Sequence, residues 1–261
     1  MRIGRTLWMV AAAALGVAQS QELPAHYDVV SIKPSAVTNG NFAVRNLPGG
    51  SLSCMAVTVK MLVMEAYGVK AFQVSGGPGW VGTTLWDMEA RVEGVQRRLP
   101  KDHLDAMVRA LLEDRFQPKV HRETKEMPVF ALVVAKGGSK LRPHTGDPVP
   151  STANHGTGSF SVKQGGVALL VNELQRQLFR VVIDKTDLKE AYDYTLTWAP
   201  EPGQGGNESL GLPPQDHRPL PAPDGPSIFT ALQEQLGLRL ESQRGPVEIV
   251  VIDGVEKPSE N

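Results

Sequence analysis

The feature that most constrains this chain is a repeated change of apolar spacing. Hydrophobic residues first recur every three or four positions, as on one face of a helix, and then at every second position or in a short run, as in a β-strand. The stretch "WDMEARV", Trp86 to Val92, alternates apolar and polar residues over seven positions. This change recurs four times, so we predict four units in which an amphipathic helix precedes two short strands.

The four predicted helices lie near residues 58–68, 102–112, 167–178 and 226–237. Thr58 and Asp102 are expected as N-caps, Pro226 lies at the start of the last helix, and Gly68 and Gly237 can end helices with a positive φ. The strands expected after each helix are Lys70 to Val74 with "WDMEARV", "KVHRET" with "VFALVVA", "RVVID" with "YDYTLTW", and "LRLES" with "VEIVVID". "YDVVSIKP" and "NFAVRN" predict two earlier strands, and "VFALVVA", apolar on both faces, is expected at the centre of a sheet.

A unit of one helix and two strands cannot bury its own apolar face, so we expect the units to pair. The prediction is an α+β protein with two lobes, each a helix-backed, mainly antiparallel sheet. The first lobe covers 21–141 and the second 167–261. A connection rich in Gly, Pro and Ser covers 142–166, and a flexible, proline-rich segment covers 201–225. A single continuous sheet is the alternative.

Residues 1–20 have the layout of a cleaved signal peptide: two arginines, an apolar run from Leu7 to Ala18, and small residues before Gln21. The run is shorter than the roughly 20 residues that a membrane-spanning anchor needs. We therefore expect export, to the periplasm or the medium, and no transmembrane segment in the mature chain. Cys54 is the only cysteine, which excludes an intramolecular disulfide, and its small and apolar neighbours predict a buried thiol rather than a reactive one.

The net charge of −1 gives no excess of cations for a phosphate backbone, so nucleic acid is not an expected partner. The chain has no H-E-x-x-H, no G-x-S-x-G and no paired cysteines. We accordingly predict no metal and no cofactor, and the sequence assigns no catalytic residue.

The stretch "GPGWVG", Gly77 to Gly82, matches the dinucleotide pattern G-x-G-x-x-G. A strand pattern follows it where a phosphate site needs a helix, and Pro78 lacks a backbone donor, so we interpret it as a wide hairpin connection. Trp80 is expected to pack on the core. If its ring is exposed instead, Gly77, Pro78, Gly79 and Trp80 form the lip of a binding site.

A second candidate binding segment is "HRE", His121 to Glu123. Its first and third residues share one strand face, which resembles the start of a zinc-deaminase motif, but the companion cysteine pair is missing. We expect Arg122, Glu123, Lys125 and Glu126 to form a solvated, charged hairpin end. His121, Arg122 and Glu123 are the candidate binding residues there. Asp184, Asp187 and Asp193 cluster near one predicted hairpin and are expected to form turns rather than a catalytic pair.

Six stretches in order carry a family resemblance: "YDVVSIKPS", "VSGGPGW", "LLEDRF", "HRETKEMPVFALVVAKGGSKL", "VIDKTDL" leading to "YDYTLTW", and the final segment from "GPSIFTALQEQLG". They resemble an uncharacterised family of exported proteins abundant in soil bacteria. The resemblance implies a shared fold and an extracytoplasmic location, and relatives with a membrane metallopeptidase of the antibiotic-sensor type imply sensing. Phe179 and Asp187 stand where the family pattern has glycine. The last unit is also similar to the small N-terminal domain of secretins and outer-membrane receptors.

The leading functional hypothesis is a non-enzymatic, exported module that binds or senses a cell-envelope protein or a small envelope ligand. One alternative is a secreted hydrolase of cell-wall or plant polymers whose carboxylates are brought together by folding. Another is a structural component that assembles through open sheet edges.

Overall fold

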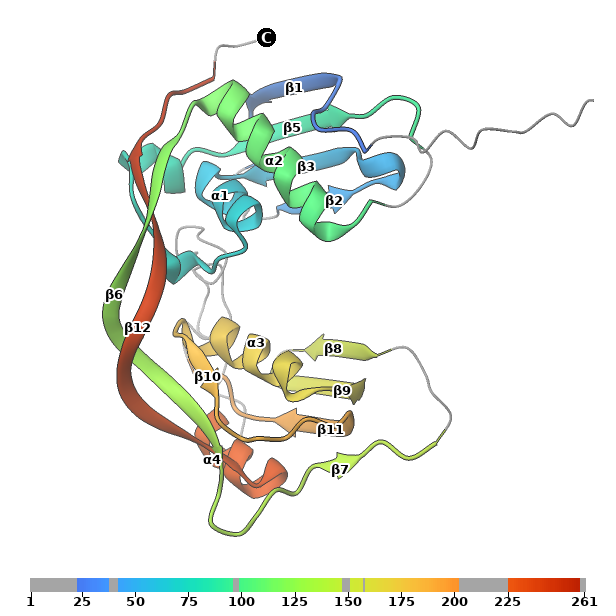
Figure 1. Ribbon diagram of the computed structural model, residues 1–261, viewed down its shortest axis with the longest axis vertical. Helices are drawn as coiled ribbons and strands as arrows, with labels where there is room; N and C mark the ends of the chain where they lie inside the picture. The colour runs from blue at the N-terminus through green and yellow to red at the C-terminus, as the bar shows by residue number, and fades with distance from the viewer. Residues whose placement is uncertain are drawn as a thin grey trace, which may run out of the picture.

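The computed structural model describes residues 23–37, 42–95, 99–146, 151–156, 158–201 and 225–258. Two lobes lie one above the other, and a ribbon of two long strands runs along one side of both (Figure 1). The mixture of helices with several sheets confirms the α+β class. The predicted signal peptide and residues 202–224 of the proline-rich segment lie outside the described residues.

The first lobe is a four-stranded antiparallel sheet with the order β1-β5-β3-β2. Its strands are β1 (Val29–Pro34), β2 (Ala43–Asn46), β3 (Leu52–Val57) and β5 (Trp86–Arg91). Helices α1 (Val59–Tyr67) and α2 (Lys101–Phe116) pack against it. Short 3-10 turns lie at Pro48–Gly50 (η1), Ala71–Gln73 (η2) and Gly79–Gly82 (η3).

The second lobe has the same plan. Its antiparallel sheet has the order β7-β11-β9-β8 and packs against α3 and α4. The strands are β7 (Arg142–Pro143), β8 (Thr152–Gly156), β9 (Ser159–Gly165) and β11 (Tyr192–Thr197). The helices are α3 (Val167–Leu178) and α4 (Ile228–Ala231), which continues into one π-helical turn, η5 (Leu232–Leu236).

The third sheet joins the lobes. Its two long strands, β6 (Lys119–Val134) and β12 (Leu238–Gly254), pair antiparallel along their whole length, and each gains one short parallel neighbour. β10 (Val182–Asp184) of the second lobe pairs with β6, and β4 (Val74–Gly76) of the first lobe pairs with β12. Each long strand therefore follows the helices of one lobe in the chain and pairs with a short strand of the other lobe (Figure 1).

Local capping explains where the helices begin and end. The hydroxyl of Thr58 accepts a hydrogen bond from the N–H of Met61 at 3.2 Å, and Gly68 ends α1 in the left-handed conformation, both as predicted. α2 has its N-cap at Pro100, two residues before the expected Asp102, and Asp102 lies in its first turn, where a carboxylate still favours the helix dipole. Gly237 ends η5 as predicted. In the described ranges, no helix is long and apolar enough to cross a bilayer.

Each lobe has its own apolar core. In the first, the buried faces of α1 and α2 contact sheet residues such as Met88 and also Val250 and Ile252 from the end of β12. In the second, α3, α4 and η5 cover Phe160 and Leu196, and Leu132 of β6 joins them. β12 follows the helices of the second lobe in the chain, and β6 follows those of the first. Each core therefore contains residues of the long strand that comes from the other lobe, so the two lobes share part of their interior packing.

The predicted repeat of four helix-and-hairpin units is not confirmed. "KVHRET" and "VFALVVA" are one continuous strand, β6, and the last two predicted strands are one strand, β12. β4 and β5 belong to different sheets, as do β10 and β11, so neither pair is a hairpin. The segment expected as the connection 142–166 holds β7, β8 and β9. What recurs is one larger order in each lobe: three sheet strands, a helix, a short parallel strand, a sheet strand, a second helix and a long exchanged strand.

Candidate functional site

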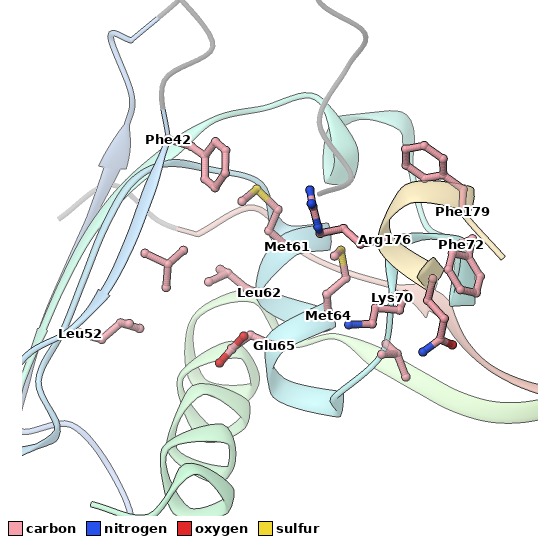
Figure 2. A pocket seen from close by; sticks show the side chains of 13 residues that line it. Phe42, Leu52, Met61, Leu62, Met64, Glu65, Lys70, Phe72, Arg176 and Phe179 are labelled. Atoms are coloured by element: carbon pink, nitrogen blue, oxygen red, sulfur yellow. The ribbon is translucent and has the colours of Figure 1, made fainter. Parts of the chain in front are cut away.

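A pocket of about 320 Å³ lies between the two lobes. Its walls come from β2, β3, α1 and η2 of the first lobe and from the end of α3 in the second (Figure 2). Most of the lining side chains are apolar, and five of them are aromatic rings or thioethers: Phe42, Met61, Met64, Phe72 and Phe179. A concave, mainly apolar cavity with a few polar groups is the usual form of a small-ligand site, and its volume lies within the usual range.

The lining follows from how the helices end. The buried stripe of α1 packs on its own lobe, and the half-buried Met64 and Glu65 of this helix are among the lining residues, with the Glu65 carboxylate turned toward Lys101 at the start of α2. α3 ends at Phe179, whose φ of 49° is left-handed, and Figure 2 shows its ring on the same side of the pocket as that of Phe72. A bulky residue in this conformation is strained, and here it supplies a lining ring.

Three charged side chains lie among the apolar ones. The carboxylate of Glu65 is already paired, since the ammonium of Lys101 lies 3.1 Å away. Lys70 is half-buried and has no ion pair with any described residue. Arg176, from α3, is the third, and Figure 2 shows both cationic side chains pointing toward α1.

The guanidinium of Arg176 is held from behind by a buried carboxylate. Glu173 is 1% exposed, and its oxygens accept hydrogen bonds from Arg176 Nη2 at 2.6 Å and Nε at 3.0 Å. Gln177 donates to the same carboxylate at 2.7 Å, and His155 Nδ1 lies 2.9 Å from it. Burial alone would raise the pKa of Glu173, but the hydrogen bonds from Arg176 and Gln177 outweigh it and the pKa is lowered. The network fixes where Arg176 points.

A second, wider cavity of about 620 Å³ shares Glu65 with the interlobe pocket, and its other lining residues belong to the first lobe. Lys101 lines this cavity between Glu65 and Asp105, and its ammonium lies 2.7 Å from the carboxylate of Asp105. One ammonium and two carboxylates give this group a net charge of −1, and its cation is paired with both acids, so this cavity offers no unpaired cation among its described lining residues.

The residues of the "GPGWVG" segment do not line the interlobe pocket. At Gly76 and Gly77 the backbone passes close to β12. The Gly77 N–H donates to the Ile252 carbonyl oxygen at 2.8 Å, and a Cβ on Gly76 would lie only 2.5 Å from that oxygen, so a side chain does not fit there. Pro78 precedes the 3-10 turn η3, which begins at Gly79. Trp80 is partly buried against the first core, as expected, and Lys257 Nζ lies 5.7 Å from its ring centre. The prediction that this loop is a hairpin connection is wrong, because it links two different sheets.

His121, Arg122 and Glu123 also lie away from the pocket, on the long strand β6 rather than at a hairpin end. Each forms an ion pair or hydrogen bond that belongs to the ribbon: His121 with Asp253 of β12 at 2.7 Å, Arg122 with Glu248 of β12, and Glu123 with Lys125. Their charges are partly exposed, and two of these pairs cross between the long strands. A role of these residues in binding stays a prediction.

Of the three aspartates expected in turns, Asp184 has local partners, whereas the prediction is wrong for Asp193, which lies in β11 and has partners distant in the sequence. Asp184 Oδ1 accepts from the N–H of Thr186 at 2.9 Å and from its hydroxyl at 2.7 Å. Asp187 itself takes a left-handed φ of 57°. Asp193 accepts from the N–H of Gln164 at 2.7 Å and lies 2.8 Å from His144 Nδ1. Backbone and His144 hydrogen bonds lower the pKa of Asp193.

Cys54 lies in the first core and is 3% exposed, which confirms the expected buried thiol. Burial, followed by the negative charges of Glu89 and Glu65, raises the pKa of this thiol to about 12. Within the described part of the chain, no group of three or more metal-ligating side chains comes together.

Sequence reasoning did not find the interlobe pocket. Its residues come from five separate elements, and no two of its charged side chains form a motif. The one available signal was Phe179, a residue that stands where the resembled family has glycine and that proves to line the pocket.

The model of the family described as Protein of unknown function (DUF3738) matches residues 60–255 of the chain. The matched range includes α1, α3 and the exchanged strands. Neither a curated protein nor a solved structure matches the chain.

Proposed function

The chain belongs to the DUF3738 family, whose description assigns no activity, and from its own geometry we propose that it is a binding module whose ligand site is the interlobe pocket. The ligand is a small, mainly apolar molecule. We further propose that the module acts outside the cytoplasm, in agreement with the signal-peptide pattern of residues 1–20.

The observation that carries this proposal is the composition of the pocket. Phenylalanine and methionine side chains from both lobes line it, and flexible thioethers adapt to ligands of different shape. A ligand held there contacts α1 of the first lobe and α3 of the second. Binding therefore bridges the lobes, which gives a sensing module a physical means of response.

The same lining does not favour the hydrolase hypothesis. Glycoside hydrolysis by the common mechanism needs two carboxyl groups on either side of the bond that breaks. Among the described residues that line the pocket, Glu65 supplies the single carboxylate, and Lys101 pairs with it. Self-assembly through sheet edges stays a prediction.

The test uses N-phenyl-1-naphthylamine, an uncharged probe that fluoresces strongly when it leaves water for an apolar site. We expect saturable binding to the native chain, and a loss of at least about tenfold in affinity in Val44→Trp. Val44 lines the pocket from the edge strand β2 and is 41% exposed, so a larger side chain there can obstruct the pocket without disturbing a core.

Val29→Trp is the matched control. Val29 is an exposed valine on β1, the other edge strand of the same sheet, and it does not line the pocket. Absence of saturable binding by the wild type, or an equal effect of the two substitutions, would contradict the proposed function.

A further inference from the structure

The interlobe pocket contains one cation without an ion pair to any described residue and a second with a guanidinium nitrogen that is not hydrogen-bonded to any described residue. Lys70 has no carboxylate partner among the described residues, although it is half-buried between apolar side chains. A buried or half-buried ammonium without a partner costs free energy, so an anion that reaches it is favoured.

Arg176 adds a second donor to the same pocket. Glu173 occupies its Nε and Nη2 atoms, while no described residue accepts a hydrogen bond from Nη1. The carboxylate behind it fixes the guanidinium plane, because two parallel hydrogen bonds restrain an arginine more than one does. The acid that also lines the pocket, Glu65, is engaged with Lys101 and does not neutralise either cation by a direct contact.

The chain as a whole has a net charge of −1, so the cations of this pocket are not part of a generally basic surface. We propose that the ligand carries one anionic group, which the Lys70 ammonium and Arg176 Nη1 bind, while its apolar body lies against the methionine and phenylalanine side chains. This inference rests on the proposed function, and it narrows the ligand class to amphipathic acids: carboxylates, sulfonates or phosphates on an aromatic or aliphatic body.

Two probes that differ by the anionic group test it. 8-Anilinonaphthalene-1-sulfonate has the ring system of N-phenyl-1-naphthylamine with one added sulfonate. We expect the sulfonate probe to bind the wild type more tightly than the neutral probe. In Lys70→Met we expect its affinity to fall by about three- to tenfold, while the affinity for the neutral probe changes less than twofold.

Lys70→Arg keeps the charge and is expected to keep most of the preference. Lys136→Met removes an equal charge from an exposed position outside the pocket and is expected to leave both affinities unchanged. Raising the salt concentration from 20 to 500 mM should weaken binding of the sulfonate probe alone, because salt screens the ion contact.

The two proposals fail in different ways. If neither probe binds, or if Val44→Trp leaves neutral-probe binding intact, the pocket is not the ligand site. If the neutral probe binds there but the sulfonate gives no preference, or if Lys70→Met lowers both affinities equally, the pocket binds ligands and the anionic class is overturned.

Discussion

The carboxylate of Asp87 accepts a hydrogen bond from the backbone N–H of Ala56 at 2.9 Å, across the bulge of β3. Ala56 is buried and has a left-handed φ of 54°. The second lobe repeats this contact: Asp193 accepts from the N–H of Gln164, whose φ is 48°. In both lobes an aspartate that follows an aromatic residue in the sheet strand holds the bulge that precedes the first helix.

This contact predicts the cost of removing Asp87. Asp87→Ala leaves the N–H of Ala56 buried and without an acceptor, so the free energy of unfolding should fall by about 1–3 kcal/mol. Urea denaturation measures the change. Glu190→Ala, at an exposed position, is the control and should stay within about 0.5 kcal/mol of wild type. If both variants have the same stability, the aspartate does not support the bulge.

Asp187 offers a test of backbone strain. It is exposed and left-handed, with a φ of 57°. Asp187→Gly should raise the free energy of unfolding by up to about 1 kcal/mol, because glycine adopts this conformation without a Cβ clash. Asp187→Ala should lower it, since alanine lacks the local hydrogen bonding that helps aspartate there. Thermal unfolding of the pair decides the matter, and changes of the same sign in both variants would exclude strain as the cause.

The Glu173 network predicts a dependence on acid. The pKa of Glu173 is lowered in the folded chain, so its contribution is complete above the ordinary value of 4.5 and is lost as the pH falls through the lower, folded value. Glu173→Gln should lower the unfolding free energy at pH 7 by about 1–3 kcal/mol. Its stability should then decline less steeply than that of the wild type below pH 4.5. Parallel curves from urea titrations at several pH values would show that the carboxylate is not stabilised by its partners.

Cys54 should be protected from alkylation. Because its pKa is raised to about 12 from the ordinary 9.0, the thiolate is about a thousandfold rarer than in the unfolded chain at pH 8, and burial slows access further. Iodoacetamide should therefore modify the native chain at least about a thousandfold more slowly than the chain in urea, as mass spectrometry can follow. Rapid modification without denaturant would mean that the first core opens locally.

The sequence predicted what depends on neighbouring residues. Helix α1 with its Thr58 and Gly68 caps, and the central place of "VFALVVA", follow from spacing and local chemistry. Pro128 and Pro246 lie in the gaps between the predicted strands, whereas β6 and β12 continue through them. Both prolines lie where the ribbon has two strands, beyond the short pairings of β10 and β4, so each strand there has a free edge that tolerates a residue without an N–H.

The interlobe pocket could not be predicted from the sequence for a different reason. Lys70 and Arg176 are more than a hundred positions apart in the sequence, and no spacing rule connects them. They share a pocket because the two lobes meet there, and that arrangement depends on which long strand pairs with which lobe. The sequence pattern of a strand predicts its faces but not its partner.

The exchange of the long strands also sets when the protein can fold during synthesis. β4 of the first lobe finds its partner only at Val250–Ile252, and the first core needs the side chains of Val250 and Ile252. A ribosome that has made the first half of the chain has therefore made a lobe without its last strand. Both lobes must remain unfinished until the final strand emerges, and contacts between residues so distant in the sequence form slowly.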